Sequence, residues 1–68
     1  MCEAVVYLRS NEVEEEVMRE VMFLEAQSDR VLISDLMGNQ KELRARVKNV
    51  DFWQHKVLVE EIGASPPL

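Results

Sequence analysis

The chain of 68 residues has one cysteine, Cys2, which directly follows the initiator methionine. A thiolate is a soft ligand that favours thiophilic transition metals. If Met1 is removed, the amine of Cys2 becomes free, and the sulfur, this amine and the next backbone nitrogen lie close enough to chelate one ion. The alternative is that Cys2 is a small buried hydrophobe, since free cysteine is among the most buried residue types. Its position alone leaves both interpretations open.

The other candidate ligand is His55, the only histidine, in the segment Phe52-Trp53-Gln54-His55-Lys56. Histidine is the commonest metal ligand among side chains. A lone histidine in a turn is nevertheless more often solvated or bonded to backbone, and no second His or Cys lies near it in sequence. Whether His55 contributes to a metal site therefore stays open.

A second chemistry is suggested by Arg44, Arg46 and Lys48, which alternate along residues 41–48 as a basic stripe, with Trp53 nearby as a stacking surface. Stacking aromatics beside cations are typical of single-strand binders. The alternative function is therefore a small RNA-binding module. Glu42 on the same face and a net charge of −5 argue against it, because nucleic-acid binders usually carry a basic footprint. We expect RNA binding to be weak or absent.

Catalytic patterns have little support in the sequence. The serines share one possible histidine partner and have no motif around them, and the two glycines, Gly38 and Gly63, form no phosphate loop. The acidic runs Glu14–Glu16 and Glu60-Glu61 are typical of solvated surface. We expect a protein that is not an enzyme.

Length and composition indicate one small domain, expected over residues 1–62, with a flexible tail at 63–68 that contains Pro66-Pro67. One cysteine cannot close a disulfide within the chain, which favours a reducing compartment. No apolar run approaches the roughly 20 residues that span a membrane. We therefore expect a cytoplasmic protein.

The elements that must position these residues are predicted to be short strands joined by tight turns. Residues 41–48 give the clearest period-two alternation of apolar and polar side chains. The segment from Glu14 to Val21 is compatible with a helix or with a short strand and a turn, and we favour the second. The expected strands are residues 3–8, part of 14–21, 21–27, 30–36, 41–48 and 56–62. The predicted fold is all-β, a small SH3-like or open β-barrel of five to six short strands.

The first expected strand is apolar on both faces, with Val6 and Leu8 on one side and Val5 and Tyr7 on the other. A chain this short has no second layer of its own to cover the outer face. We therefore predict a homodimer whose interface includes Val5 or Tyr7.

The pattern as a whole resembles the CooT family of small nickel-binding proteins, some of which are catalogued as predicted RNA-binding proteins. The resemblance rests on the opening Met1–Leu8, on Val31–Leu36 with Gly38, on Val47–Phe52 and on His55–Glu60. It implies a homodimer of small barrels in which Cys2 of each subunit lies near the interface. The Cys2 pair would bind one Ni(II) per dimer and support nickel delivery to carbon monoxide dehydrogenase or another nickel enzyme. The acidic run Glu14–Glu16 and the proline tail depart from the family pattern.

Overall fold

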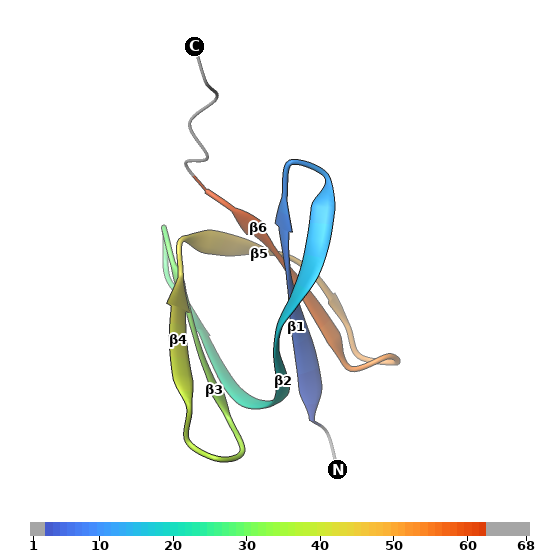
Figure 1. The fold of residues 1–68 in the computed structure, drawn as a ribbon, viewed down its shortest axis with the longest axis vertical. Coiled ribbons are helices and arrows are strands. Elements are labelled where there is room, and N and C mark those ends of the chain that lie inside the picture. Colours follow the sequence, from blue (N-terminus) through green and yellow to red (C-terminus); the bar gives the residue numbers. More distant parts are fainter. Residues whose placement is uncertain (1–2, 63–68) are drawn as a thin grey trace.

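A computed structural model describes residues 3–62 of the chain, which form six strands and no helix. Cys2 and the expected tail at 63–68 lie outside the described residues. The strands are β1 (Ala4–Ser10), β2 (Val13–Ala26), β3 (Val31–Asp35), β4 (Gln40–Leu43), β5 (Ala45–Asp51) and β6 (Lys56–Glu61). They make one sheet in the order β4-β3-β2-β1-β6-β5 (Figure 1). The predicted all-β class and small open architecture are confirmed.

The sheet curls around one small core without closing. β1 pairs with β6 in parallel, while the other neighbouring strands pair antiparallel. Curling brings β3 into contact with β5, across the opening between the two edge strands. Every strand except the short β4 contributes to the buried core, which consists of Val6, Val21, Val31, Ile33, Ala45, Val57 and Val59.

The long strand β2 decides the shape of the sheet. It pairs with β1 along its first part and with β3 along its second, and Val21 is in register with both Ala4 and Asp35. At the changeover Glu20 adopts a φ of 57°, and such an irregularity bends a strand and increases its twist. The preference for strand over helix at 14–21 is therefore confirmed. The expected turn between two strands is wrong, because the chain bends at Glu20 without leaving the sheet.

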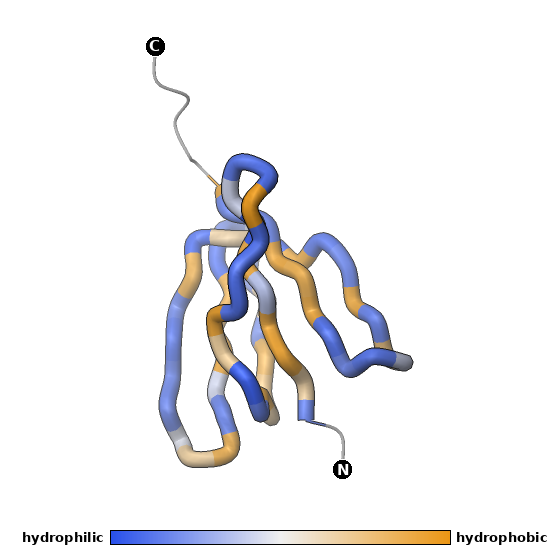
Figure 2. The backbone as a smooth tube through the Cα atoms, turned by 45° about the vertical axis from the view of Figure 1, so that its right-hand side comes forward, coloured by the Kyte–Doolittle hydropathy of each residue, from blue (hydrophilic) through white to orange (hydrophobic). Residues whose placement is uncertain are grey.

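The strand expected at 41–48 is divided by a corner. Arg44 lies between β4 and β5, and the backbone N–H of Ile62 donates to its carbonyl at 2.8 Å. The period-two alternation continues through this corner, since Ala45 is buried and Leu43 and Val47 pack against the core. The alternation predicts which side chains face inward, but it does not predict where the strand changes direction. Figure 2 shows apolar and polar positions interleaved along the strands.

Two hairpins end in tight turns. Ser10 pairs with Val13, and the two loop residues Asn11 and Glu12 have φ values of 54° and 68°. Positive φ at both central residues is the mark of a type I′ turn, whose twist matches that of the flanking strands. Between β2 and β3 the N–H of Gln27 donates to the carbonyl of Arg30 at 2.8 Å across Ser28-Asp29.

The outer face of β1 is partly covered within one chain. Val5 and Tyr7 are half-buried, and the Lys56 ammonium nitrogen lies 4.8 Å from the centroid of the Tyr7 ring. A cation at this distance is attracted by the ring face. Part of the cover that we expected from a second subunit therefore comes from β6. An interface through Val5 or Tyr7 stays a prediction.

Candidate functional site

The start of β1 is anchored on both sides, because β1 is an inner strand between β2 and β6. The N–H of Val5 donates to the carbonyl of His55 at 2.9 Å, which ties the strand to the β5–β6 turn. Cys2 lies outside the described residues and is separated from Ala4 in sequence by Glu3 alone. The candidate metal ligand thus lies two residues before an inner strand that is paired on both sides.

The β5–β6 turn that holds this strand is itself fixed by Asp51. One carboxylate oxygen of Asp51 accepts hydrogen bonds from the backbone N–H groups of Trp53 and Gln54, each at 3.0 Å. An aspartate that bonds to the backbone two residues on mimics a turn and stabilises it. The sequence marked Val50-Asp51-Phe52 as a family-like segment without giving Asp51 a role, although an Asp at the end of a strand is a recognised turn signal.

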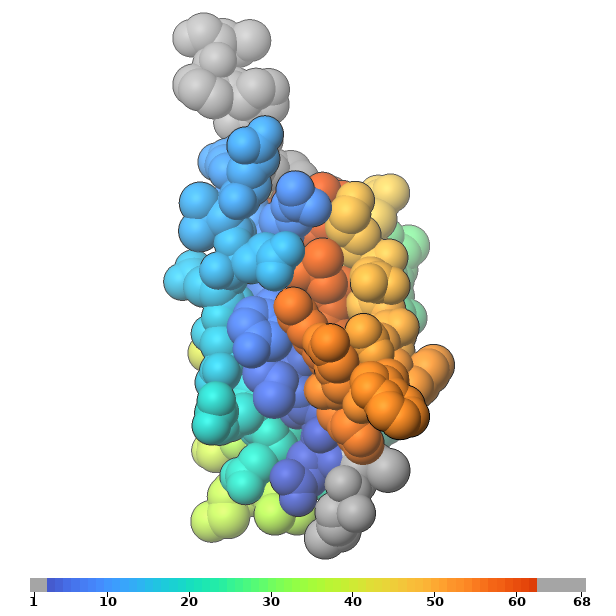
Figure 3. Space-filling model, turned by 90° about the vertical axis from the view of Figure 1, so that its right-hand side faces the viewer, coloured from blue at the N-terminus to red at the C-terminus, as the bar shows by residue number. Residues whose placement is uncertain are grey.

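The turn displays the two most exposed large hydrophobic side chains of the described residues. Phe52 is 85% exposed and Trp53 is 91% exposed. Beside them is a hollow of about 320 Å³, lined by Ala4, Val50, Asp51, Phe52, His55, Lys56 and Val57. In Figure 3 this orange turn stands out near the dark-blue start of β1. An apolar protrusion and an apolar hollow therefore lie side by side at the end of the sheet where the described chain begins.

His55 lies in this turn with an exposed side chain and a φ of 56°. Histidine is one of the non-glycine residues enriched at positive φ, so the turn geometry gives a structural reason for its presence. No group of three or more His, Cys, Asp or Glu side chains suited to a metal ion occurs among residues 3–62. The described residues thus place His55 beside Ala4 and assign it no partner ligand.

The three cations of the basic stripe do not lie on one regular strand. Arg44 is at the corner before β5, and the register of β5 with β6 shifts between Val47 and Asn49, at Lys48. The Lys48 ammonium lies 3.7 Å from a carboxylate oxygen of Glu60, and Arg46 is in register with that same Glu60. Trp53 lies beyond the far end of β5. The corner at Arg44 and the register shift at Lys48 thus interrupt the strand that was expected to carry the three cations.

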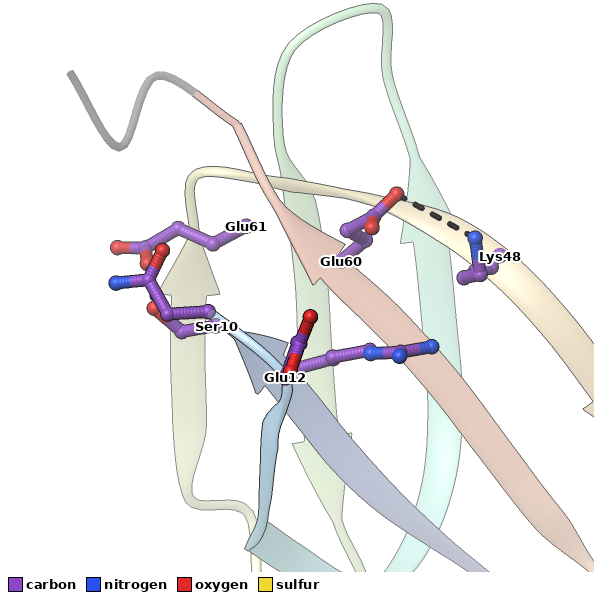
Figure 4. A pocket seen from close by; sticks show the side chains of 7 residues that line it. Ser10, Glu12, Lys48, Glu60 and Glu61 are labelled. Atoms are coloured by element: carbon purple, nitrogen blue, oxygen red, sulfur yellow. Dashed lines mark hydrogen bonds and ion pairs between the residues drawn. The ribbon is translucent and has the colours of Figure 1, made fainter. Parts of the chain in front are cut away.

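A polar cleft of about 450 Å³ lies at the opposite end of β1, between the β1–β2 hairpin and strands β5 and β6 (Figure 4). Its lining residues are Arg9, Ser10, Asn11, Glu12, Lys48, Glu60 and Glu61. The Ser10 hydroxyl donates to the Glu61 carboxylate, and Lys48 pairs with Glu60. The positive and negative groups of this cleft are interleaved, so it offers no field of one sign to a charged ligand.

Comparison with known proteins identifies the family. Residues 1–60 match the family described as CO dehydrogenase accessory protein CooT. The chain belongs to the CooT family. The family description is that of an accessory protein to CO dehydrogenase rather than of a catalyst, and it covers Cys2 as well as the β5–β6 turn.

Two curated relatives support membership in the CooT family. An uncharacterized protein of Methanocaldococcus jannaschii is 33% identical over 60 residues, which are 88% of this chain and 98% of the relative. An uncharacterized protein of Methanothermobacter thermautotrophicus is 27% identical over 60 residues, which are 88% of this chain and 89% of the relative.

A solved structure shows the CooT fold directly. The crystal structure of a protein assigned as CooT from Carboxydothermus hydrogenoformans matches with a TM-score of 0.80 at 24% identity, covering 90% of this chain and 98% of that one. At this identity the likeness concerns the fold. The described residues contain no helix long and apolar enough to cross a membrane.

Proposed function

We propose that this protein binds one Ni(II) per dimer through Cys2 of two subunits and supports nickel insertion into carbon monoxide dehydrogenase or another nickel enzyme. The observation that carries the proposal is the family match over residues 1–60, which assigns the chain to CO dehydrogenase accessory proteins and includes the single cysteine. Nickel is here a cargo that the protein delivers, and the sheet serves to present its ligands.

Ligand chemistry supports a site that is shared between subunits. One thiolate is too few donors to hold a transition metal tightly, while a two-fold axis doubles every ligand. Two thiolates with backbone or terminal nitrogens suit the square-planar or tetragonal geometry that Ni(II) adopts. Zn(II) prefers four tetrahedral ligands, and Cu(I) is also thiophilic, so metal competition belongs in the test.

Position supports the proposal as well. Hydrogen bonds hold β1 from Val5 onward, and only Glu3 and Ala4 separate Cys2 from that residue. A short, anchored connection limits the volume that a thiolate explores, which raises its effective concentration near a second such thiolate.

The test is a Ni(II) titration of protein with an untagged N-terminus, followed by calorimetry and by the thiolate-to-metal absorption band. We expect about one ion per two chains, and loss of both signals in Cys2→Ser. Light scattering on Cys2→Ser separates loss of the ligand from loss of the dimer. One tight ion per monomer, or tight binding that survives Cys2→Ala, would contradict the proposal. His55→Ala serves as the matched variant from the same end of the sheet and is expected to keep the ion.

A further inference from the structure

We infer that the aromatic turn of one copy, formed by Phe52 and Trp53, docks into the apolar hollow of a second copy, and that this reciprocal contact brings the two N-termini together. The contact differs from the one expected through the outer face of β1. It rests on the proposed function in one respect: a shared nickel site needs two N-termini.

The first argument is that the surface is complementary to itself. A two-fold interface uses the same patch on both subunits, so a feature on one copy must meet its complement on the other. The patch beside Ala4 has both parts, an aromatic protrusion and a hollow of about 320 Å³ with Val50 and Val57 in its lining. A rotation that seats one turn in one hollow therefore seats the second turn in the second hollow.

The second argument is that the protrusion is rigid before it binds. Asp51 holds the backbone of Trp53 and Gln54, and the Val5–His55 hydrogen bond fixes the end of the turn to β1. A preorganised loop loses little conformational entropy on association. Tryptophan is also the residue type that most often dominates the binding energy of an interface.

The third argument is one of area. An aromatic side chain buries about 150–250 Å² when it is enclosed, and a two-fold contact would enclose four of them. Together with the hollows that receive them, they account for much of the roughly 1,200 Å² at which specific interfaces begin. At the other end of β1 the charged cleft of Arg9, Glu12 and Glu61 offers no comparable apolar area.

Location selects a second copy over an unrelated protein as the occupant. Ala4 lines the hollow, so a turn seated there lies beside the start of the described chain in its partner. By symmetry the starts of β1 in the two copies then lie beside two adjoining contacts, and each start, Ala4, is two residues from Cys2 in sequence. The other exposed apolar turn, with Leu36 and Met37 between β3 and β4, does not contribute to the lining of this hollow.

The experiment uses Trp53 as its own reporter, because it is the only tryptophan. On dilution of the full chain we expect the emission to move to longer wavelength as the indole returns to water, in parallel with the loss of dimer mass by light scattering. Trp53→Glu should weaken the dimer at least about tenfold, as for a central interface residue, while Trp53→Phe should retain it.

Val13→Glu is the matched control, since Val13 is 61% exposed at the opposite end of β1, and it should remain dimeric. Tyr7→Glu tests the interface through the outer face of β1 that the sequence predicts. A monomeric Tyr7→Glu together with a dimeric Trp53→Glu would favour that face and overturn this inference. A dimer whose Trp53 emission is that of exposed indole would overturn the inference, as would a dimeric Trp53→Glu or a wild-type chain that is monomeric throughout. A Ni(II) titration of the wild-type chain separates the two proposals: a wild-type dimer through Trp53 that binds no nickel leaves this inference standing and removes the proposed function.

Discussion

Several single residues have unusual backbone geometry, and they lie at the turns and at the bend of the sheet. Among residues 3–62, four non-glycine residues have positive φ: Asn11, Glu12, Glu20 and His55. Asparagine and histidine tolerate this region, whereas glutamate has no side-chain feature that favours it. The strain at Glu12 and Glu20 is local and stays within the sheet because strand pairing on either side fixes the backbone.

Glu12→Gly is expected to stabilise the protein by about 1 kcal/mol, since it replaces a strained residue by the one that type I′ turns favour after asparagine. For a domain of this size such a gain raises Tm by about 4–8 °C. Thermal unfolding followed by circular dichroism at fixed protein concentration measures it. Glu12→Ala removes the same carboxylate and keeps the strain, so an equal gain in that variant would show that charge and not φ is responsible.

Asp35 is a residue whose titration we expect to affect stability. A hydrogen bond from the Asn39 side chain lowers its pKa below the ordinary value, against a smaller opposing effect of burial and with further help from the backbone N–H groups of Asn39 and Met37. Because the folded-state pKa is depressed, this stabilisation is present above the unfolded pKa and is lost as pH falls through the folded one.

Asp35→Asn should therefore lower Tm near neutral pH and flatten its decline on the acid side of pH 4, the region in which an aspartate titrates. A Tm profile against pH for the two proteins provides the check. An unchanged acid limb in Asp35→Asn would show that the β3–β4 turn does not depend on this carboxylate. Glu15→Gln is a suitable exposed control for removal of one negative charge.

At the scale of elements, β2 and β5 show how irregularities direct the sheet. The bend at Glu20 lets β2 pair with β1 and then with β3, and the corner at Arg44 turns the chain from β4 into β5. The register shift at Lys48 gives β5 a second irregularity. These deviations curl the strands of the described residues around their buried core.

The strand that carries Arg44, Arg46 and Lys48 is interrupted at two positions, which supports the expectation that RNA binding is weak. The basic stripe offers at most three phosphate contacts. For single-stranded RNA this corresponds to a slope of about −2 in a plot of log binding constant against log salt concentration, and to modest affinity. Anisotropy of labelled single-stranded RNA at near-physiological salt should show no submicromolar binding, and Arg44→Glu/Arg46→Glu should change little. Tight binding that this double variant abolishes would restore the RNA-binding alternative.

At the scale of the whole molecule, the small core limits stability. A core of this size supplies about 3–5 kcal/mol, and Ile33 is its largest fully buried side chain, 1% exposed. Isoleucine to alanine in such a position costs about 2–5 kcal/mol. The proposed dimer and the proposed metal binding would each add stability by mass action.

Ile33→Ala is therefore expected to leave little or no folded monomer in water, as measured by urea unfolding monitored by circular dichroism. Val13→Ala, at an exposed position, should shift the free energy of unfolding by no more than about 0.5 kcal/mol. A loss below about 1 kcal/mol in Ile33→Ala would mean that the core is larger or more adaptable than its seven residues indicate.

The sequence by itself determined the all-β class, the number of strands within the predicted range, most of the turns and the inward-facing side chains. Alternation of apolar and polar residues is a short-range signal, and over residues 41–48 it was sufficient to predict which side chains face inward. The family also followed from the sequence, because its opening residues and its Val-Asp-Phe segment are contiguous in the chain.

Only the tertiary structure decided that β1 lies parallel to β6, that β2 bends at Glu20 without a turn, and that Arg44 ends one strand before the next begins. Each of these three features depends on which distant strand a segment pairs with. A local pattern of residues does not identify that partner strand. The same holds for the candidate site: the Val5–His55 hydrogen bond joins residues 50 positions apart and sets Phe52, Trp53 and their hollow beside the start of the first strand.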